Sequence, residues 1–210
     1  MNAGPPTPGW YGKLPALGDF ASRRLDPGWI ARWDGWLAAG LQGLREAEPE
    51  AWLPRYLGAP AWRFALLPGV LEDDTLRVGT LVPSVDRVGR YFPLVLASPP
   101  LPQPADLIAA VALWHWAGQL EDIAITALQQ DWDADALEQA LAELADATVS
   151  APLALPPCDD PMAQHLALCC RNAAWRGLQG RSLWCHEAGA PWLATGLPDG
   201  AEFARLFTPV

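Results

Sequence analysis

Apolar residues in the first quarter of the chain recur at intervals of three and four, which is typical of an amphipathic helix. The helix begins after Asp26 and Pro27, which suit the N-cap and the first helical position. The pattern predicts a helix over 29–46 and a shorter helical piece over 50–57. The apolar positions of the first helix are Trp29, Ile30, Trp33, Leu37, Leu41 and Leu44.

The pattern changes at residue 61 to short apolar segments bounded by turn residues, which is typical of strands. Strands are expected over 10–12, 61–69, 75–83 and 90–98. Pro93 lies inside the last segment and lacks a backbone donor, so an edge position or a bulge is expected there. Short links between neighbouring strands favour antiparallel pairing.

The second half of the chain is mainly helical and ends with two further strands. The expected elements are helices over 105–130, from Asp133 or Asp135 to 146, and over 162–178, strands over 181–187 and 191–197, and a terminal helix over 199–207 capped by Asp199. We therefore expect one α+β (α/β) domain over 10–210, with a mostly antiparallel central sheet covered by helices. Residues 1–9 are expected to be a flexible N-terminus, and the proline-rich joint at 99–104 leaves open a division into two lobes.

Acidic residues outnumber basic ones, 24 to 14, and the formal net charge is −10. Such a protein is repelled by a nucleic-acid backbone and by an anionic membrane surface. No apolar run is long enough to cross a membrane, and the N-terminus lacks the features of a secretion signal. We expect a cytoplasmic protein without membrane insertion, whose four cysteines are reduced thiols.

The residues of enzymes and metal sites are sparse. Only three histidines are present, and no zinc-binding spacing, GxSxG elbow or phosphate-binding loop occurs. His165 and Cys169 are four residues apart on an expected helix and so share one face. A small thiol packed in the core beside a hydrogen-bonded histidine explains this pair more simply than a metal site does. The sequence therefore predicts no catalytic residue, metal or cofactor, and a hydrolase using Ser84 and Asp86 stays as an alternative.

The stretch "VPSVDRVGRYFPLVLASPP" over 82–100 gathers polar residues in a turn between two strands. Ser84 and Asp86 are suited to hydrogen-bond the turn backbone, which Gly89 helps to close, and Asp86 can pair with Arg87 or Arg90. A loop held in this way presents two guanidinium groups and Tyr91 in a fixed shape. Such a loop is either structural or a recognition site.

Four segments, "GWYGKLPALGDFASRRL", "WDGWLAAGL", "WLPRYLGAPAWRFAL" and "GTLVPSVDRVGRYFPL", together resemble the TagF family of accessory proteins of the bacterial type VI secretion system. The resemblance covers about residues 9–98 and is weaker beyond, where Cys185 and His186 stand in place of the tryptophan and threonine frequent in the family. Two signature segments match the family residue by residue. They contain Gly12, Lys13, Leu14, Pro15, Gly18, Asp19 and Phe20 in the first, and Pro83, Ser84, Asp86, Arg87, Gly89, Arg90 and Tyr91 in the second.

The resemblance implies a cytoplasmic, post-translational repressor of type VI secretion that binds the forkhead-associated scaffold protein of that system, with no catalytic residue to transfer. A structural accessory subunit of the secretion baseplate is a further alternative, and the oligomeric state stays open. We also expect the two signature segments to meet in space and form one surface, with Asp19 bracing Arg87 or Arg90.

Overall fold

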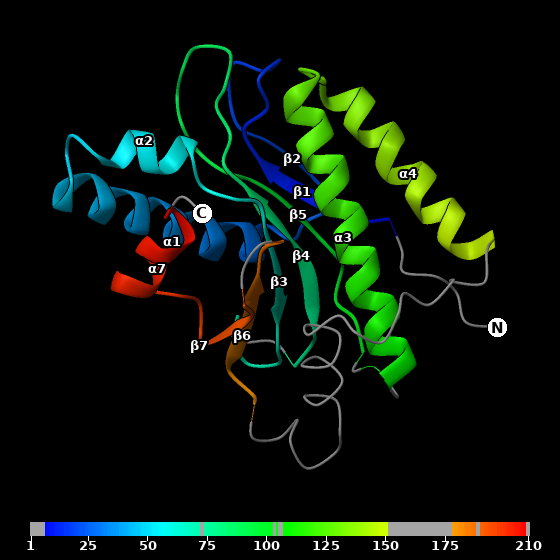
Figure 1. Ribbon diagram of the computed structural model, residues 1–210. Coiled ribbons are helices and arrows are strands. Elements are labelled where there is room, and N and C mark those ends of the chain that lie inside the picture. Colours follow the sequence, from blue (N-terminus) through cyan, green and yellow to red (C-terminus); the bar gives the residue numbers. More distant parts are fainter. Residues whose placement is uncertain are drawn as a thin grey trace.

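A seven-stranded sheet forms the centre of the molecule (Figure 1). The computed structural model describes residues 7–71, 74–102, 104, 107–150, 178–187 and 190–208. The strand order is β2-β1-β5-β4-β3-β6-β7, and every neighbouring pair is antiparallel. The strands are β1 (Gly9–Gly12), β2 (Ala21–Arg23), β3 (Trp62–Leu66), β4 (Arg77–Val82), β5 (Leu94–Ala97), β6 (Arg181–Cys185) and β7 (Trp192–Thr195).

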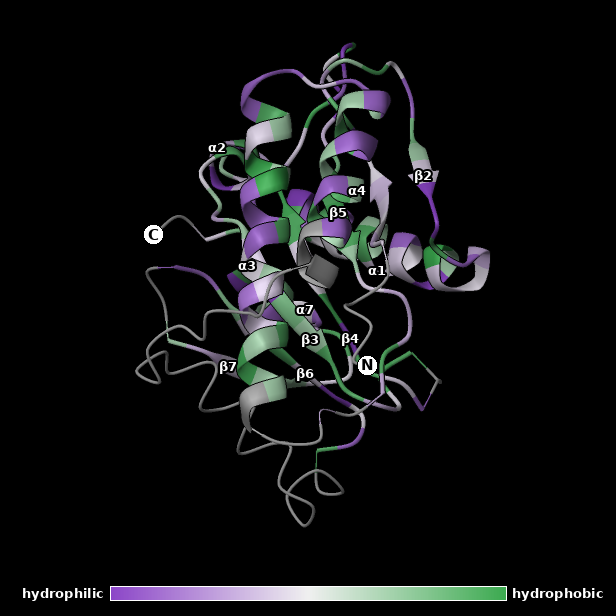
Figure 2. Ribbon diagram, turned by 90° about the vertical axis from the view of Figure 1, so that its right-hand side faces the viewer, coloured by the Kyte–Doolittle hydropathy of each residue, from purple (hydrophilic) through white to green (hydrophobic). Residues whose placement is uncertain are grey.

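Helices cover both faces of this sheet and give the molecule three layers (Figure 1). One face carries α1 (Pro27–Ala47), α2 (Trp52–Leu57) and α7 (Gly200–Leu206). The other carries α3 (Leu107–Gln129), which packs on β3, β4 and β5, and α4 (Ala134–Ser150), which packs on α3. Seen from that second side, α3 and α4 lie over the strands, and β2 is at the edge of the sheet (Figure 2). The described helices and strands make one α+β domain, as the sequence predicts.

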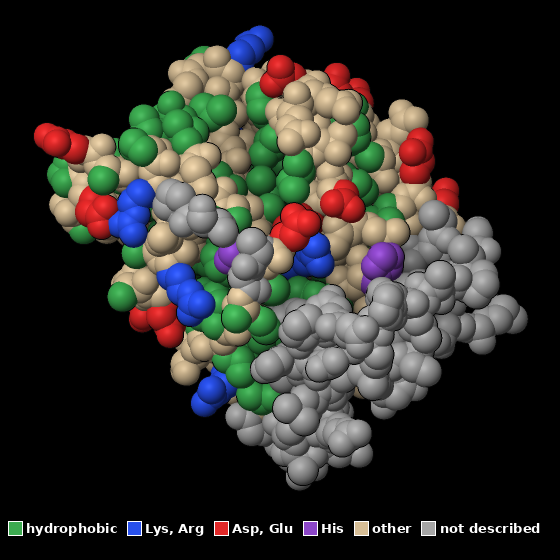
Figure 3. Space-filling view, viewed as in Figure 1, with side chains coloured by type: hydrophobic (Ala, Val, Ile, Leu, Met, Phe, Trp, Pro, Cys, Tyr) green, Lys and Arg blue, Asp and Glu red, His purple; other side chains and the backbone are tan. Residues whose placement is uncertain are grey.

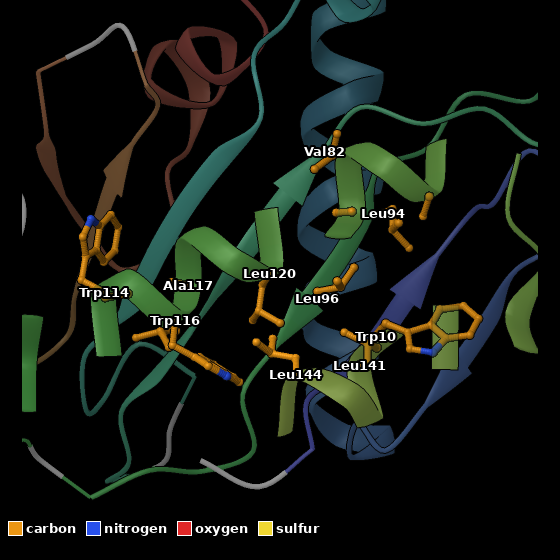
Figure 4. Close-up of a cluster of buried hydrophobic side chains, with 14 of the residues drawn as sticks. Trp10, Val82, Leu94, Leu96, Trp114, Trp116, Ala117, Leu120, Leu141 and Leu144 are labelled. Carbon is orange, nitrogen blue, oxygen red and sulfur yellow. The ribbon is translucent and has the colours of Figure 1, made fainter. Parts of the chain in front are cut away.

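The alternation of side chains along each strand divides the core into two apolar clusters. In β5, Leu94 and Leu96 face α3 and α4, while Val95 and Ala97 face α1. The cluster under α3 and α4 also contains Trp10, Trp114, Leu120 and Leu141 (Figure 4). Apolar side chains therefore cover both faces of the central strands, whereas the edge strand β2 is partly exposed.

The start of α1 follows the sequence closely. Asp26 is the N-cap and its carboxylate accepts a hydrogen bond from Trp29 N at 3.0 Å, with proline in the first turn. The start of α4 is similar, because Asp133 accepts from Ala136 N at 2.9 Å. Asp199 also occupies the N-cap position of α7, but its side chain makes no capping hydrogen bond.

Two features differ from the sequence-based expectation. Pro93 is not at a sheet edge, because β5 begins at Leu94 and lies between β1 and β4. The proline thus precedes the strand, where its missing donor disrupts no ladder. The edge strand β2 was not expected, because its three residues are too few to show a period. The helix expected over 162–178 lies almost wholly outside the described residues, and the lobe boundary at 99–104 stays a prediction.

A close approach between α1 and α7 depends on one glycine. A Cβ at Gly40 would overlap the ring of Phe203, whereas a Cβ at Gly43, in the next turn, would have no neighbour within 4 Å. Gly40 is therefore a packing requirement, and Gly43 only lowers helix propensity.

The two glycines give a matched pair of substitutions with opposite signs. Gly40→Ala should lower the free energy of unfolding by about 1–3 kcal/mol, because the Phe203 ring must move. Gly43→Ala should raise the same quantity by about 0.5–1 kcal/mol through helix propensity. Urea denaturation of both variants measures the difference, and an equal effect of the two would contradict the packing described here.

Candidate interaction site

Two loops meet at one end of the sheet, and we call them the two-loop site: residues 13–20, which follow β1, and residues 84–91, which follow β4. Both loops project from the same end of the molecule, at the top of Figure 1. Arg87 N donates to Leu17 O at 2.9 Å, and Ser84 Oγ donates to Lys13 O at 2.7 Å. The expectation that the two signature segments meet in space is confirmed.

The first loop leaves β1 in a conformation that only glycine tolerates. Gly12 has φ of +135°, and a Cβ there would overlap the carbonyl oxygen of Pro93. The chain then makes a turn closed by Leu17 N donating to Leu14 O at 2.9 Å, with Pro15 at its second position. Gly12 and Pro15 thus determine the shape of the loop.

The second loop is a turn organised by one carboxylate. Asp86 Oδ1 accepts from Val88 N at 3.0 Å and from Arg90 N at 2.9 Å. Gly89, with φ of +82°, donates its N–H to Asp86 O at 3.0 Å. The pairing of Val85 with Tyr91 closes the base of the turn. The turn is fixed by its own polar groups, as the sequence suggests.

A buried ion pair joins the two loops. Lys13 Nζ lies 2.5 Å from Asp86 Oδ2, and the two side chains are 3% and 0% exposed. Asp86 Oδ2 also accepts from Arg90 Nε at 2.7 Å, and Lys13 Nζ lies 4.2 Å from the centroid of the Phe20 ring. Each buried charge is thus paired and hydrogen-bonded, which a charge in an apolar interior requires.

These contacts lower the pKa of the Asp86 carboxyl. Burial by itself raises the pKa, but the hydrogen bonds from Lys13, from Arg90 and from Val88 N outweigh burial and hold the pKa far below its usual range. Asp86 is therefore a permanent anion near neutral pH. Such a group is a structural counter-charge and is unsuited to exchanging protons.

Ser84 is buried and fully engaged. Its Oγ donates to Lys13 O, its carbonyl oxygen accepts from Tyr56 Oη at 2.7 Å, and its N–H donates to Tyr56 Oη at 2.9 Å. Burial is also the main cause that raises the pKa of the Tyr56 hydroxyl, which stays protonated.

Among the described histidines, His115 is on α3 over the other face of the sheet, and His186 packs on Trp62. His165 lies outside the described residues. The described part of the chain therefore brings no base to Ser84.

The exposed part of the two-loop site contains apolar side chains, the arginines Arg87 and Arg90, and the carboxylate of Asp19. Phe20, Leu57 and Val88 are the large hydrophobic side chains exposed among the described residues, at 43%, 58% and 64%. Phe20 and Val88 are in the two loops. Leu57 follows Tyr56, which anchors Ser84. Arg87 is exposed and its guanidinium has no hydrogen-bond or ion-pair partner within the part of the chain that the structure describes.

The remaining predicted residues brace this surface. Arg90 donates to Gly18 O and lies 3.6 Å from the carboxylate of exposed Asp19, so Asp19 braces Arg90. Tyr91 is half-buried, with its ring 5.9 Å from Trp52 and 5.8 Å from Tyr56. Sequence reasoning missed Val88 and Leu57, because a single apolar residue in a turn or at a helix end has no periodic partner to mark it.

Other parts of the described chain offer less chemistry. No group of three or more metal-ligating side chains converges within the described ranges. No helix in those ranges is both long and apolar enough to span a bilayer. An apolar groove of about 480 Å³ lies between α1 and α7, lined mainly by Trp36, Phe203 and small side chains, with Glu48 and Asp199 also in its lining. The two-loop site is therefore the best-supported candidate.

Comparison with known proteins gives a family and a related structure. The family model for the TagF N-terminal domain, described as type VI secretion system-associated, matches residues 9–144. The chain is also similar to the crystal structure of PA0076 from Pseudomonas aeruginosa PAO1, determined at 2.05 Å resolution. The two chains share 34% sequence identity, with a TM-score of 0.72, over 96% of this chain and 94% of that chain. No curated protein matches the chain. The family match includes both segments of the two-loop site.

Substituting Asp86 should change how stability depends on pH. The pKa of Asp86 is lower in the folded chain than its unfolded value of about 3.9. The pairing therefore stabilises the fold above about pH 4, and this contribution is lost as the pH falls below that value toward the folded-state pKa. Asp86→Asn should lower the midpoint of thermal unfolding near neutral pH, and the difference from the wild type should shrink under acid conditions.

Thermal unfolding followed by circular dichroism across this pH range measures the effect. Asp19→Asn is the matched control, because Asp19 is an exposed carboxylate in the same site. Parallel curves for the wild type and Asp86→Asn over the whole range would contradict a stabilising role of the buried pair.

The two arginines of the second loop should behave differently. Arg90→Ala removes the donors to Asp86 and to Gly18 O and should lower the unfolding midpoint clearly. Arg87→Ala removes only an exposed side chain and should leave the free energy of unfolding within about 0.5 kcal/mol of wild type. Urea denaturation distinguishes the two, and equal destabilisation would show that Arg87 is also structural.

Proposed function

The chain belongs to the TagF family of type VI secretion-associated proteins, and on that premise we propose that it is a post-translational repressor of this secretion system. It acts in the cytoplasm, by binding the forkhead-associated scaffold protein through the two-loop site. The observation that carries the proposal is a rigid, internally paired platform that presents Arg87, Phe20 and Val88 to solvent.

Binding without catalysis is the activity that this platform supports best. The polar groups that could take part in catalysis already bind other groups of the protein. Asp86 is paired with Lys13 and Arg90, and Ser84 Oγ donates to a backbone oxygen. The groups left exposed include apolar side chains and the Arg87 guanidinium, which are common anchors of protein interfaces, beside the Asp19–Arg90 pair. This division argues against the hydrolase alternative and for a binding protein.

The proposal predicts repression that depends on an exposed side chain. Overproducing the wild-type chain in a host with an active type VI system should reduce export of the tube protein, and Arg87→Ala should relieve that reduction. The matched control is Arg181→Ala, because Arg181 is an exposed arginine at the start of β6, at the opposite end of the sheet. Immunoblotting of the culture supernatant measures export.

A pull-down with the scaffold protein accompanies the export assay. Capture of the scaffold by the wild type and by Arg181→Ala, but less by Arg87→Ala, supports the proposal. Unchanged export with abundant folded wild-type protein would contradict the repressor role. Stable co-purification with the baseplate in place of the scaffold would favour the structural-subunit alternative.

A further inference from the structure

We propose that the two-loop site binds a protein segment in which a carboxylate lies beside an apolar side chain. Arg87 pairs with the carboxylate, and Val88 together with Phe20 contacts the apolar side chain. This inference rests on the proposed function only in using the same surface, because it concerns the chemistry of the bound segment rather than the identity of the protein that carries it.

The positions of the exposed side chains are the first support. Arg87 and Val88 are consecutive in the second loop, and Phe20 is in the first. A backbone hydrogen bond joins the loops beside these residues, because Arg87 N donates to Leu17 O. A Cβ placed on Gly18 would lie 3.6 Å from Arg87 Nη2, so the guanidinium lies over the first loop, two residues from Phe20. The guanidinium of Arg87 therefore lies close to the segment that carries Phe20, and the exposed Val88 is the next residue along the second loop.

The charge balance of the site is the second support. Lys13 and Arg90 are both engaged with Asp86, and Asp19 lies beside Arg90. The two loops carry three cations against two carboxylates, so Arg87 is the cation left over. Acidic and basic side chains both stand at this end of the molecule in Figure 3. An exposed guanidinium on an otherwise acidic protein suits a carboxylate, to which it can donate two parallel hydrogen bonds.

The net charge of the chain decides between classes of partner. A nucleic acid or an anionic membrane presents many negative charges, and a chain of net charge −10 repels both. One uncompensated arginine does not offset that repulsion, but it can pair with one carboxylate. The neighbouring apolar side chains then need an apolar group on the same ligand. A protein segment with both features meets these conditions.

The site is also preorganised for binding. Asp86 fixes the turn that carries Arg87 and Val88, and Phe20 stacks on Tyr11, with ring centroids 5.7 Å apart, and contacts Phe92 edge-on at 4.8 Å. Holding the interface groups in place before binding reduces the entropy lost on association. The backbone of the site should therefore change little when the segment binds.

Arg87 and Val88 are the side chains that test the surface without damaging the fold. Both residues use their backbone N–H groups to build the site, and both side chains are exposed. Phe20 is less suitable because its ring also covers Lys13. The variants are therefore Arg87→Glu and Val88→Ser, with Arg181→Glu as the control at the far end of the sheet.

Short acetylated peptides supply the probe, because they do not require the scaffold protein. The sequence GDLDFEG combines carboxylates with apolar side chains, GKLKFKG reverses the charge, and GDSDSEG removes the apolar groups. We expect GDLDFEG to shift the backbone amide NMR signals of residues 17–20 and 86–91 of the full chain. Arg87→Glu and Val88→Ser should each weaken binding about tenfold or more, as is typical of an interface anchor. Added salt should also weaken it.

Three results would overturn the inference: equal shifts with GKLKFKG, equal shifts with GDSDSEG, or shifts by GDLDFEG only outside the two loops. The scaffold pull-down separates this inference from the proposed function. Localised binding of GDLDFEG without scaffold capture would support the inference and contradict the proposed partner. Scaffold capture that is unchanged in Arg87→Glu and Val88→Ser would support the partner and contradict the inference.

Discussion

The two-loop site depends on the buried ion pair between Lys13 and Asp86, which are 73 residues apart in the sequence. Two charges withdrawn from water need each other, so the first loop cannot move away without leaving Asp86 short of a partner, and the reverse holds for Lys13. The pair therefore fixes the relative position of the two loops more strictly than apolar contact would, because hydrophobic packing is not directional. Arg90 extends the same constraint outward, from Asp86 to Gly18 O and Asp19.

The sheet brings the two loops to the same place before any side chain acts. β5 lies between β1 and β4 and is antiparallel to both. β1 and β4 therefore run in the same direction, and their C-terminal ends lie at the same end of the sheet. Gly12 lets β1 leave the sheet against Pro93, the residue that precedes β5. Apolar clusters on both faces hold these three strands, so the ion pair forms on a rigid base. The core supplies stability, and the polar contacts above it determine one arrangement of the loops.

Most of the fold follows from local patterns in the sequence. The period of α1, its Asp26 cap and the strand-like segments leading into β3, β4 and β5 are properties of neighbouring residues, and these predictions are confirmed. The strand β2 and the central position of β5 depend on contacts with distant strands, which no local pattern encodes. The site is similar: the turn around Asp86 is predictable from Asp86, Gly89 and Arg90 alone. That Asp86 takes Lys13 as its partner, and that Val88 stays exposed, are consequences of the tertiary structure.

The structure assigns two different roles to residues that look alike in the signature segments. Lys13, Ser84, Asp86 and Gly12 are polar or small, as residues of an active site often are, yet all four are buried or committed to the backbone of the loops. Arg87 and Phe20 belong to the same segments and are exposed. Val88, which lies between two signature positions, is also exposed. Most residues of the two segments therefore shape the platform, and the proposed recognition is assigned to the few side chains that the platform leaves exposed.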